Sequence, residues 1–199
     1  QKLLNHFEIK NDLLSYNEHN HEQRVEQIME KLLNKEDVAL VSDAGMPAIS
    51  DPGYELVQAA IKQAINIVVL PGANAALCAL VGSGLATNEF LFAGFLPRKK
   101  KDKLEKLKAL GNRKATVILY ESPYRVKDTL KAIDEQLGNR QLAIAREITK
   151  MYEQFIRGKV EDVLEWLEEN EIKGECCIVM EGSDETIEND DWWQSLSLE

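Results

Sequence analysis

Residues 115–147 read ATVILYESPYRVKDTLKAIDEQLGNRQLAIARE, and this stretch decides the fold class. The apolar run 115–120 is typical of a buried strand, and residues 124–137 repeat apolar side chains at the spacing of an amphipathic helix. A second apolar run follows at 141–147. A strand, a helix and a strand in this order predict an α/β fold with largely parallel strands.

The same alternation extends in both directions along the chain. We expect further strands at 37–41, 66–70, 89–95 and 175–182, and a possible strand at 152–158. We expect further helices at 22–34, 54–64, 73–84 and 160–170. A basic stretch separates two such sets, so we predict four parts: an N-terminal α/β domain at 1–96, a basic junction at 97–114, a C-terminal α/β domain at 115–182 and an acidic tail or linker at 183–199.

Composition bounds the class of protein. The 199 residues are 44% hydrophobic, so the chain can bury a sizeable core, and the net charge of −10 repels polyanions on average. No apolar run approaches the roughly 20 residues of a membrane helix, and no signal peptide is visible. Cys176 and Cys177 are adjacent in an apolar run, which predicts reduced thiols and a cytoplasmic protein. Without a CxxC motif or a third ligand near His19 and His21, we expect no metal site.

Charge is unevenly distributed along the chain. Residues 96–114 hold nine Lys or Arg against two acidic residues, whereas residues 160–199 hold one Lys against fourteen Asp or Glu. This asymmetry favours a basic contact surface on an otherwise acidic protein. The alternative is that the basic stretch is the solvated face of a helix.

Residues 42–53, SDAGMPAISDPG, form an unusual loop after an apolar run. Gly45 and Gly53 allow the backbone to turn sharply and to approach a ligand closely. Asp43 and Asp51 can accept hydrogen bonds from hydroxyls or amines. Ligands of α/β proteins gather where strands end, so this loop is a candidate binding loop rather than an ornate turn.

Two further loops follow predicted strands. LPGANAA at 70–76 leads into a helix whose free N–H groups suit a carboxylate or carbonyl, and YESPYR at 120–125 places Glu121 and Arg125 at a strand-to-helix turn. Each loop alone is weak, because a Pro-Gly after a strand is usually only a turn. The chain has no GxGxxG motif, no P-loop and no GxSxG motif, so nothing here supports a dinucleotide site, NTP hydrolysis or a serine hydrolase.

Seven blocks of the chain, taken in order, resemble one family. The blocks are HFEIKNDLLSYNEHN, VALVSDAGMPAISDPGYELV, VVLPGANAAL, FLFAGFLPRKK, YESPYR, AREITK and GECCIVMEG. They run from about residue 2 to residue 182 and resemble the 16S ribosomal RNA ribose 2′-O-methyltransferase family, ribosomal RNA small subunit methyltransferase I, of the tetrapyrrole methylase superfamily. Family members begin with a strand and a further donor-site loop upstream of the point matching Gln1, so we expect the chain to be N-terminally truncated.

The resemblance implies a two-domain α/β fold with its active-site cleft between the domains, and it implies a homodimer. It also implies S-adenosylmethionine as methyl donor. The implied acceptor is a cytidine ribose 2′-hydroxyl in 16S rRNA or the small ribosomal subunit. For the donor we predict contacts from both domains. These residues are Ser42, Asp43, Ala44, Gly45, Pro47, Ser50, Asp51, Pro71, Gly72, Ala75, Tyr120, Glu121, Ser122 and Gly174.

For the acceptor side, the resemblance favours Glu147 as the base or hydroxyl acceptor, since a ribose hydroxyl is a poor nucleophile at neutral pH. The residues predicted to contact RNA are His19, Asn20, Arg98, Lys99, Lys100, Lys101, Lys103, Arg125, Arg146 and Lys150. The alternative for Glu147 is a structural ion pair with Arg146. Two alternative functions stay open at this point: a tetrapyrrole methylase of the same superfamily, and an RNA- or donor-binding form without turnover.

Overall fold

The computed structural model describes residues 2–183, and the chain divides into two units, residues 1–73 and residues 74–199, which we describe separately. The four-part division expected from the sequence, with a boundary near residues 96–100, stays a prediction, as does the cleft between domains. Of the expected acidic tail, residues 184–199 lie outside the described residues.

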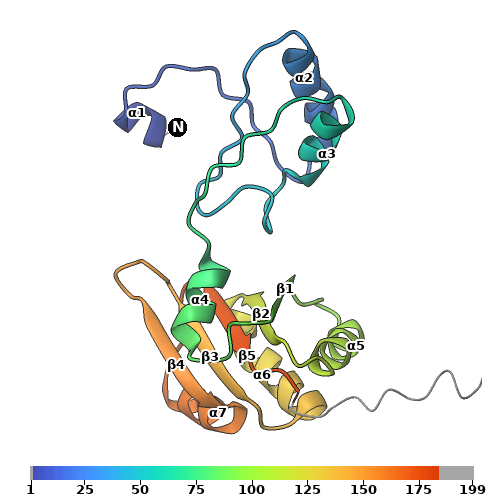
Figure 1. Ribbon diagram of the computed structural model, residues 1–199. Coiled ribbons are helices and arrows are strands. Elements are labelled where there is room, and N and C mark those ends of the chain that lie inside the picture. The colour runs from blue at the N-terminus through green and yellow to red at the C-terminus, as the bar shows by residue number, and fades with distance from the viewer. Residues whose placement is uncertain (1, 184–199) are drawn as a thin grey trace, which may run out of the picture. The chain divides into compact units, whose positions relative to one another are not determined.

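The second unit contains a five-stranded sheet, which confirms the α/β class (Figure 1). Its strands are β1 (Phe90–Phe95), β2 (Thr116–Glu121), β3 (Gln141–Arg146), β4 (Gln154–Lys159) and β5 (Cys176–Met180), in the spatial order β1-β2-β5-β3-β4. Every strand expected in this half of the chain forms. Their pairing was predicted incorrectly: β1 and β2 are parallel, but β2–β5, β5–β3 and β3–β4 are antiparallel.

The insertion of β5 explains two of the three antiparallel pairs, and the third joins the consecutive strands β3 and β4. The connection from β2 through helix α6 (Pro123–Leu137) to β3 leaves β2 and β3 pointing the same way, as helical crossovers do. It also leaves one position between them, and β5 fills that position in the opposite direction. Alternation along the sequence identifies the connections, but it does not say which strands become neighbours.

Helices cover both faces of the sheet (Figure 1). On one face α5 (Lys100–Gly111), α6 (Pro123–Leu137) and α7 (Val160–Glu169) bury the larger part of the core, including Leu107, Leu130 and Val163. On the other face α4 (Ala75–Ser83) packs its small side chains against the sheet. Successive residues of β5 alternate between the two clusters, as the period of a strand requires.

The first unit consists of α1 (Lys2–His6), α2 (His21–Leu33), α3 (Tyr54–Lys62) and long connecting segments. Ile28 of α2 and Leu56 of α3 are buried, and the two helices contact each other. The expected strands at 37–41 and 66–70 do not form; Val68 and Leu70 are 75% and 77% exposed. An extended apolar segment becomes a strand only when a neighbouring strand pairs with its backbone, and residues 2–73 contain none.

Candidate functional site

The predicted site residues of the second unit gather at one edge of the sheet. At this edge Glu121, the last residue of β2, lies opposite Cys176 of β5, which in turn lies opposite Arg146, the last residue of β3. Phe95 ends β1 opposite Tyr120. We call this edge the site edge and define it as Phe95 with residues 120–125, 146–150 and 173–176.

Glu147 occupies the centre of a polar cluster at the site edge. Its Oε1 accepts hydrogen bonds from the backbone N–H of Glu175 (2.9 Å) and from Nζ of Lys150 (3.0 Å). Nζ of Lys150 also lies 2.8 Å from Oε2 of Glu175. Within residues 2–183, Oε2 of Glu147 accepts no hydrogen bond. One carboxylate oxygen is thus fixed by the protein, and the other can accept a hydrogen bond from a ligand.

These partners set the protonation of the cluster. The Glu175 backbone N–H, followed by Lys150, lowers the pKa of Glu147 below its ordinary value. Hydrogen bonds to Glu175 and Glu147 raise the pKa of Lys150. Glu147 is therefore a stable carboxylate at neutral pH. A lowered pKa weakens a general base but leaves a good hydrogen-bond acceptor.

The backbone around Glu147 is built to hold its side chain in place. Glu147 has a positive φ of 48°, which a non-glycine residue adopts only rarely. Gly174 has φ +84°, and a Cβ there would lie 2.4 Å from Cδ of Glu147. Gly174 is thus needed so that the carboxylate can lie against the chain before β5. Among the described residues, Arg146 and Glu147 form no ion pair: Nη1 of Arg146 donates to the carbonyl of Lys173 (3.2 Å), and its buried Nε has no partner there.

Glu121 has a different environment from Glu147. Its side chain is buried, and Oε1 lies 3.3 Å from Nε of Arg125 and accepts from the N–H of Ser122 (2.9 Å). Oε2 accepts from the hydroxyl of Thr129 (2.8 Å). Nη2 of Arg125 also donates to the carbonyl of Leu96 (2.9 Å). Both oxygens of Glu121 are therefore used inside the protein, so this residue supports the loop predicted to bind the donor.

Sequence reasoning did not identify Thr129 as part of this network. Arg125 and Thr129 are four residues apart on one face of α6, directly after Glu121 at the end of β2, and that spacing could have found Thr129. Sequence reasoning also missed Glu175, which follows Glu147 by 28 residues. No local pattern carries such a contact.

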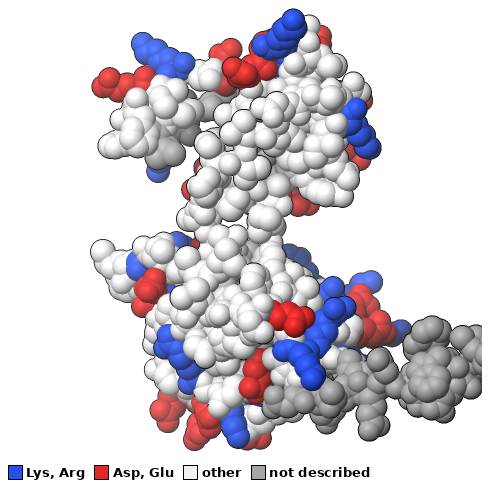
Figure 2. Space-filling view, viewed as in Figure 1, with Lys and Arg blue, Asp and Glu red and all other residues white. Residues whose placement is uncertain are grey.

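Five of the basic residues predicted to contact RNA, residues 98–101 and Lys103, lie at or directly before the start of α5. The helix begins after Lys99, without a side-chain cap, and Lys100 and Lys101 are exposed in its first turn. Nζ of Lys100 lies 3.4 Å from Glu135, and Nζ of Lys101 lies 4.0 Å from Glu105. Lys103 does not share this exposure: it is 8% exposed and donates to Thr129 (3.4 Å). Figure 2 shows Lys and Arg gathered over the region of α5, with acidic residues beside them.

In the first unit, the loop 42–53 closes on itself. Oγ of Ser42 lies 2.8 Å from Oδ2 of Asp51 and 2.9 Å from the carbonyl of Ala44. Gly45 has φ +81°, and Gly53 could not carry a Cβ without meeting Leu40 at 2.9 Å. The hydrogen bonds of residues 2–183 leave the exposed carboxylate of Asp43 without a partner.

The segment 71–73 lies against this loop. A Cβ on Gly72 would be 3.3 Å from Cγ of Met46, and one on Gly45 would be 3.6 Å from the carbonyl of Ala73. The structure therefore brings the predicted residues Pro71 and Gly72 to the loop of Asp43. The next residue, Asn74, caps α4 by accepting a hydrogen bond from the N–H of Leu77 (3.0 Å), immediately before the predicted Ala75.

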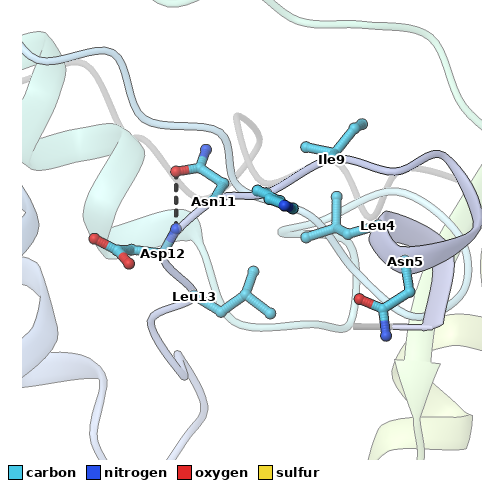
Figure 3. Close-up of a pocket in the computed structure, with 7 residues that line it drawn as sticks. Leu4, Asn5, Ile9, Asn11, Asp12 and Leu13 are labelled. Carbon is cyan, nitrogen blue, oxygen red and sulfur yellow. Dashed lines mark hydrogen bonds between the residues drawn. The ribbon is translucent and has the colours of Figure 1, made fainter.

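The remaining predicted residues of the first unit organise a turn. The Asn20 amide oxygen accepts from the N–H of Asn17 (2.8 Å), and the N–H of His19 donates to the side chain of Asn17 (3.0 Å). A separate hollow of about 560 Å³ is bounded by residues 4–5 and 9–13 (Figure 3). None of the predicted site residues lines it, and its one internal contact in the figure joins Asn11 to the N–H of Asp12 (2.9 Å).

Two of the three cysteines are buried in β5, whereas Cys78 on α4 is exposed. Cys176 and Cys177 are buried free thiols, and burial raises their pKa to about 11 and about 12. Among residues 2–183, no group of three or more His, Cys, Asp or Glu is arranged to hold a metal ion. In the same part of the chain, no helix is long and apolar enough to cross a membrane.

Comparison with known proteins places this geometry in a family. The model of the Tetrapyrrole (Corrin/Porphyrin) Methylases matches residues 2–164. A protein of Halalkalibacterium halodurans named Ribosomal RNA small subunit methyltransferase I is 52% identical over 198 residues, which is 99% of this chain and 68% of that protein. The protein of the same name from Bacillus subtilis is 48% identical over 199 residues, again 68% of its length.

Solved structures agree at the level of the fold. The methyltransferase CobJ matches with a TM-score of 0.60 at 17% identity, over 81% of this chain and 71% of that one. Diphthine synthase matches with a TM-score of 0.66 at 13% identity, over 90% and 72% of the two chains. The family resemblance identified in the sequence is thereby confirmed: this chain belongs to the tetrapyrrole methylase family and, within it, to the ribosomal RNA small subunit methyltransferase I proteins.

Proposed function

We propose that the protein transfers a methyl group from S-adenosylmethionine to the 2′-hydroxyl of a cytidine ribose in small-subunit ribosomal RNA. One observation carries this proposal: relatives named for rRNA methylation are up to 52% identical over 99% of the chain. The tetrapyrrole methylases among the structural neighbours are under 25% identical and support the fold alone. The relatives therefore favour an RNA acceptor over a tetrapyrrole.

The residues of loop 42–53 fit the chemistry of the donor. S-adenosylmethionine supplies an electrophilic methyl group on a sulfonium sulfur, and it also carries an amine, a carboxylate and ribose hydroxyls. Asp43 presents an exposed carboxylate that can accept from hydroxyls or the amine. The turn at Gly45 has no side chain in the way, and the Ser42–Asp51 contact holds the two ends of the loop together. We assign donor binding to this loop, with Pro71 and Gly72 beside it.

At the site edge we assign Glu147 to the acceptor hydroxyl. Its Oε1 is held by Lys150 and the Glu175 N–H, so the side chain is already oriented before a substrate binds. Its Oε2 is available to accept a hydrogen bond from a ribose hydroxyl. That hydrogen bond would orient the hydroxyl group and so fix the direction of the lone pairs on the hydroxyl oxygen. The lowered pKa of Glu147 favours this orienting role over strong general-base catalysis.

Positive charge at the start of α5 supports binding of the RNA backbone. Cations at a helix N-terminus interact unfavourably with the helix dipole. A phosphate bound there is attracted both by the cations and by the N-terminal end of the dipole. Arg98, Lys99, Lys100 and Lys101 supply this charge on a protein whose net charge is −10. Lys103 is left out of this assignment because it is buried. Charge reversal at 99–101 is expected to weaken RNA binding and to flatten its salt dependence while donor binding is unchanged.

The homodimer and the cytoplasmic location expected from the sequence remain part of the proposal. Cys176 and Cys177 are adjacent residues of a buried strand and make poor disulfide partners, which suits a reducing compartment. Sedimentation of the purified chain tests the dimer: a single species at twice the monomer mass supports it, and a monomer at all concentrations rejects it.

A methyl-transfer assay tests the proposed function. The chain is incubated with unmodified small ribosomal subunits, or with isolated rRNA, and with S-adenosylmethionine labelled in its methyl group. We expect label in the 16S rRNA of the parent protein. Because Glu147→Gln loses the fixed carboxylate acceptor, its turnover should fall by about 10²-fold. Glu169→Gln, an exposed change on α7, is the matched control and should leave turnover unchanged.

Donor binding is measured separately by titration calorimetry. Asp43→Asn should weaken binding of S-adenosylmethionine by about tenfold, the loss of one charged hydrogen bond. Asp37→Asn changes an exposed carboxylate of the same unit outside the loop and serves as the control. Parent-like donor affinity in Asp43→Asn would reject the assignment of the loop. Donor and RNA binding without any transfer would instead support a binding form without turnover.

A further inference from the structure

Two aromatic side chains at the site edge have no role in the core. Phe95, the last residue of β1, is 58% exposed, and Tyr124 in the first turn of α6 is 94% exposed. The ring of Phe95 meets the ring of Tyr120 edge to face, with centroids 5.8 Å apart. Tyr120 in turn meets Phe92 in the same way at 4.9 Å. Phe95 is therefore the solvent-exposed end of a short row of rings that begins inside the sheet.

The main chain carrying these two rings is tied together by Arg125. Its guanidinium donates to the carbonyls of Leu96 (2.9 Å) and Pro97 (3.3 Å) and is paired with the buried Glu121. Arg125 follows Tyr124 directly, and Leu96 follows Phe95. The residues next to each ring are thus joined by hydrogen bonds, so the two rings are presented from a braced backbone.

Positive charge continues directly from this aromatic pair. Arg98 and Lys99 follow Phe95 by three and four residues, and Lys100 and Lys101 open α5 with side chains 75% and 85% exposed. Exposed rings beside a run of cations are the combination by which proteins bind single-stranded nucleic acid. Cations bind the phosphates, and ring faces stack on unpaired bases.

We propose that Phe95 and Tyr124 form a stacking platform for unpaired bases of the RNA substrate, next to the phosphate contacts of residues 98–101. This inference rests on the proposed RNA substrate and adds where the bases lie. It assigns the two parts of the interface different chemistry: the cations supply salt-dependent affinity, and the rings supply affinity that depends on the presence of a base and little on salt.

A fluorescent base reports stacking directly. A single-stranded RNA oligonucleotide carrying 2-aminopurine loses emission when a ring stacks on that base. We expect the parent protein to quench the emission on binding and Phe95→Ala to bind about tenfold more weakly with little quenching. Phe95→Leu keeps an apolar side chain without a ring face, so it should resemble Phe95→Ala. Tyr124→Ala should show a smaller loss in the same direction.

Two controls separate stacking from a loss of structure or charge. Phe90→Ala removes a 43% exposed phenylalanine at the opposite end of β1 and should bind like the parent. Lys100→Gln should lower the slope of affinity against salt and keep the quenching, whereas Phe95→Leu should keep the slope and lose the quenching. An oligonucleotide with abasic sites should bind the parent and Phe95→Leu equally.

The outcomes also separate this inference from the proposed function. Parent-like affinity and quenching in both Phe95 variants would overturn the platform and leave methyl transfer to rRNA untouched. The platform would also be overturned if Phe95→Leu weakened binding of the abasic oligonucleotide as much as binding of the intact one. The lost affinity would then not depend on a base. Phe95-dependent quenching by a protein that transfers no methyl group to rRNA would support the platform and reject the proposed function.

Discussion

The two units of this chain share one sequence pattern and differ in what it builds. In both, apolar runs alternate with amphipathic helices. In residues 74–183 five runs pair into a sheet whose central strand β5 is buried along its whole length. In residues 2–73 the runs 37–41 and 66–70 are extended but unpaired. The difference shows that an extended segment forms a strand only when a second segment pairs with it. The partner supplies both the backbone hydrogen bonds and the burial of side chains.

The same contrast applies to the candidate site. At the site edge, Glu147 is fixed by partners that are 3 and 28 residues away in the chain. In the loop 42–53 the side-chain hydrogen bonds of Ser42 are local, to residues two and nine positions away. The site edge is therefore supported by a sheet, and the loop 42–53 of the first unit is supported by its own hydrogen bonds.

Hydrogen exchange should give the largest difference between the units. The amides of β5 pair with β2 and β3, while within residues 2–183 the amides of 66–70 donate no backbone hydrogen bond. We expect β5 to be protected by about 5 kcal/mol or more of opening free energy, and 66–70 to exchange close to the unprotected rate. Mass spectrometry of exchanged peptides measures both. Similar protection of the two segments would remove the basis of the comparison.

Truncation of an apolar side chain should destabilise the protein much more in the sheet of the second unit than in residues 66–70 of the first unit. Ile178 of β5 is fully buried, and Ile178→Ala is expected to cost about 2–5 kcal/mol in the free energy of unfolding. Val68→Ala, at a 75% exposed apolar residue of the first unit, should change it by less than about 0.5 kcal/mol. Urea unfolding followed by circular dichroism gives both values. A large cost for Val68→Ala would mean that residues 66–70 are buried in solution.

Two glycines with the same backbone angle sharpen the contrast. At Gly45 (φ +81°) a Cβ would make an ordinary contact with the carbonyl of Ala73 at 3.6 Å, whereas at Gly174 (φ +84°) a Cβ would meet Glu147 at 2.4 Å. Both alanine variants carry the backbone cost of about 1 kcal/mol, and Gly174→Ala adds the displacement of the carboxylate. We therefore expect lower protection of residues 147–150 and loss of turnover in Gly174→Ala. The double variant Glu147→Ala, Gly174→Ala should lose less stability than the two single changes added together.

These experiments also mark how far the sequence could predict the fold. Helices α2, α3, α6 and α7 follow from periodicity, because the pattern that defines a helix is local. The sequence did not predict the antiparallel β5 or the unpaired runs. Strand pairing depends on contacts between distant segments, and no single segment encodes which strand becomes its neighbour. For the site, the sequence predicts the loops of Asp43 and Glu147 as candidates, and their roles stay predictions. It could not locate Glu175 as a partner of Glu147, since that contact depends on strand register.

The smallest expected effect is the pH dependence of the Glu147 cluster. The pKa of Glu147 is lowered in the folded protein, so its contribution to stability is present above its ordinary pKa and is lost as the pH falls through the lowered value. We expect the parent and Glu147→Gln to differ in protection of residues 147–150 at neutral pH and to converge in acid. A carboxyl titration by NMR should place the Glu147 pKa below its ordinary value, and Lys150→Met should raise it. A Glu147 pKa unchanged by Lys150→Met would contradict the cluster.

The identity of the methylated nucleoside tests the central claim most directly. Small ribosomal subunits lacking the modification are incubated with the protein and with S-adenosylmethionine carrying a deuterated methyl group, and the rRNA is digested to nucleosides for mass spectrometry. The account predicts labelled 2′-O-methylcytidine from the parent and its strong reduction with Glu147→Gln, but not with Glu169→Gln. Label on a base, label on a ribose other than that of cytidine, or full labelling by Glu147→Gln would contradict it.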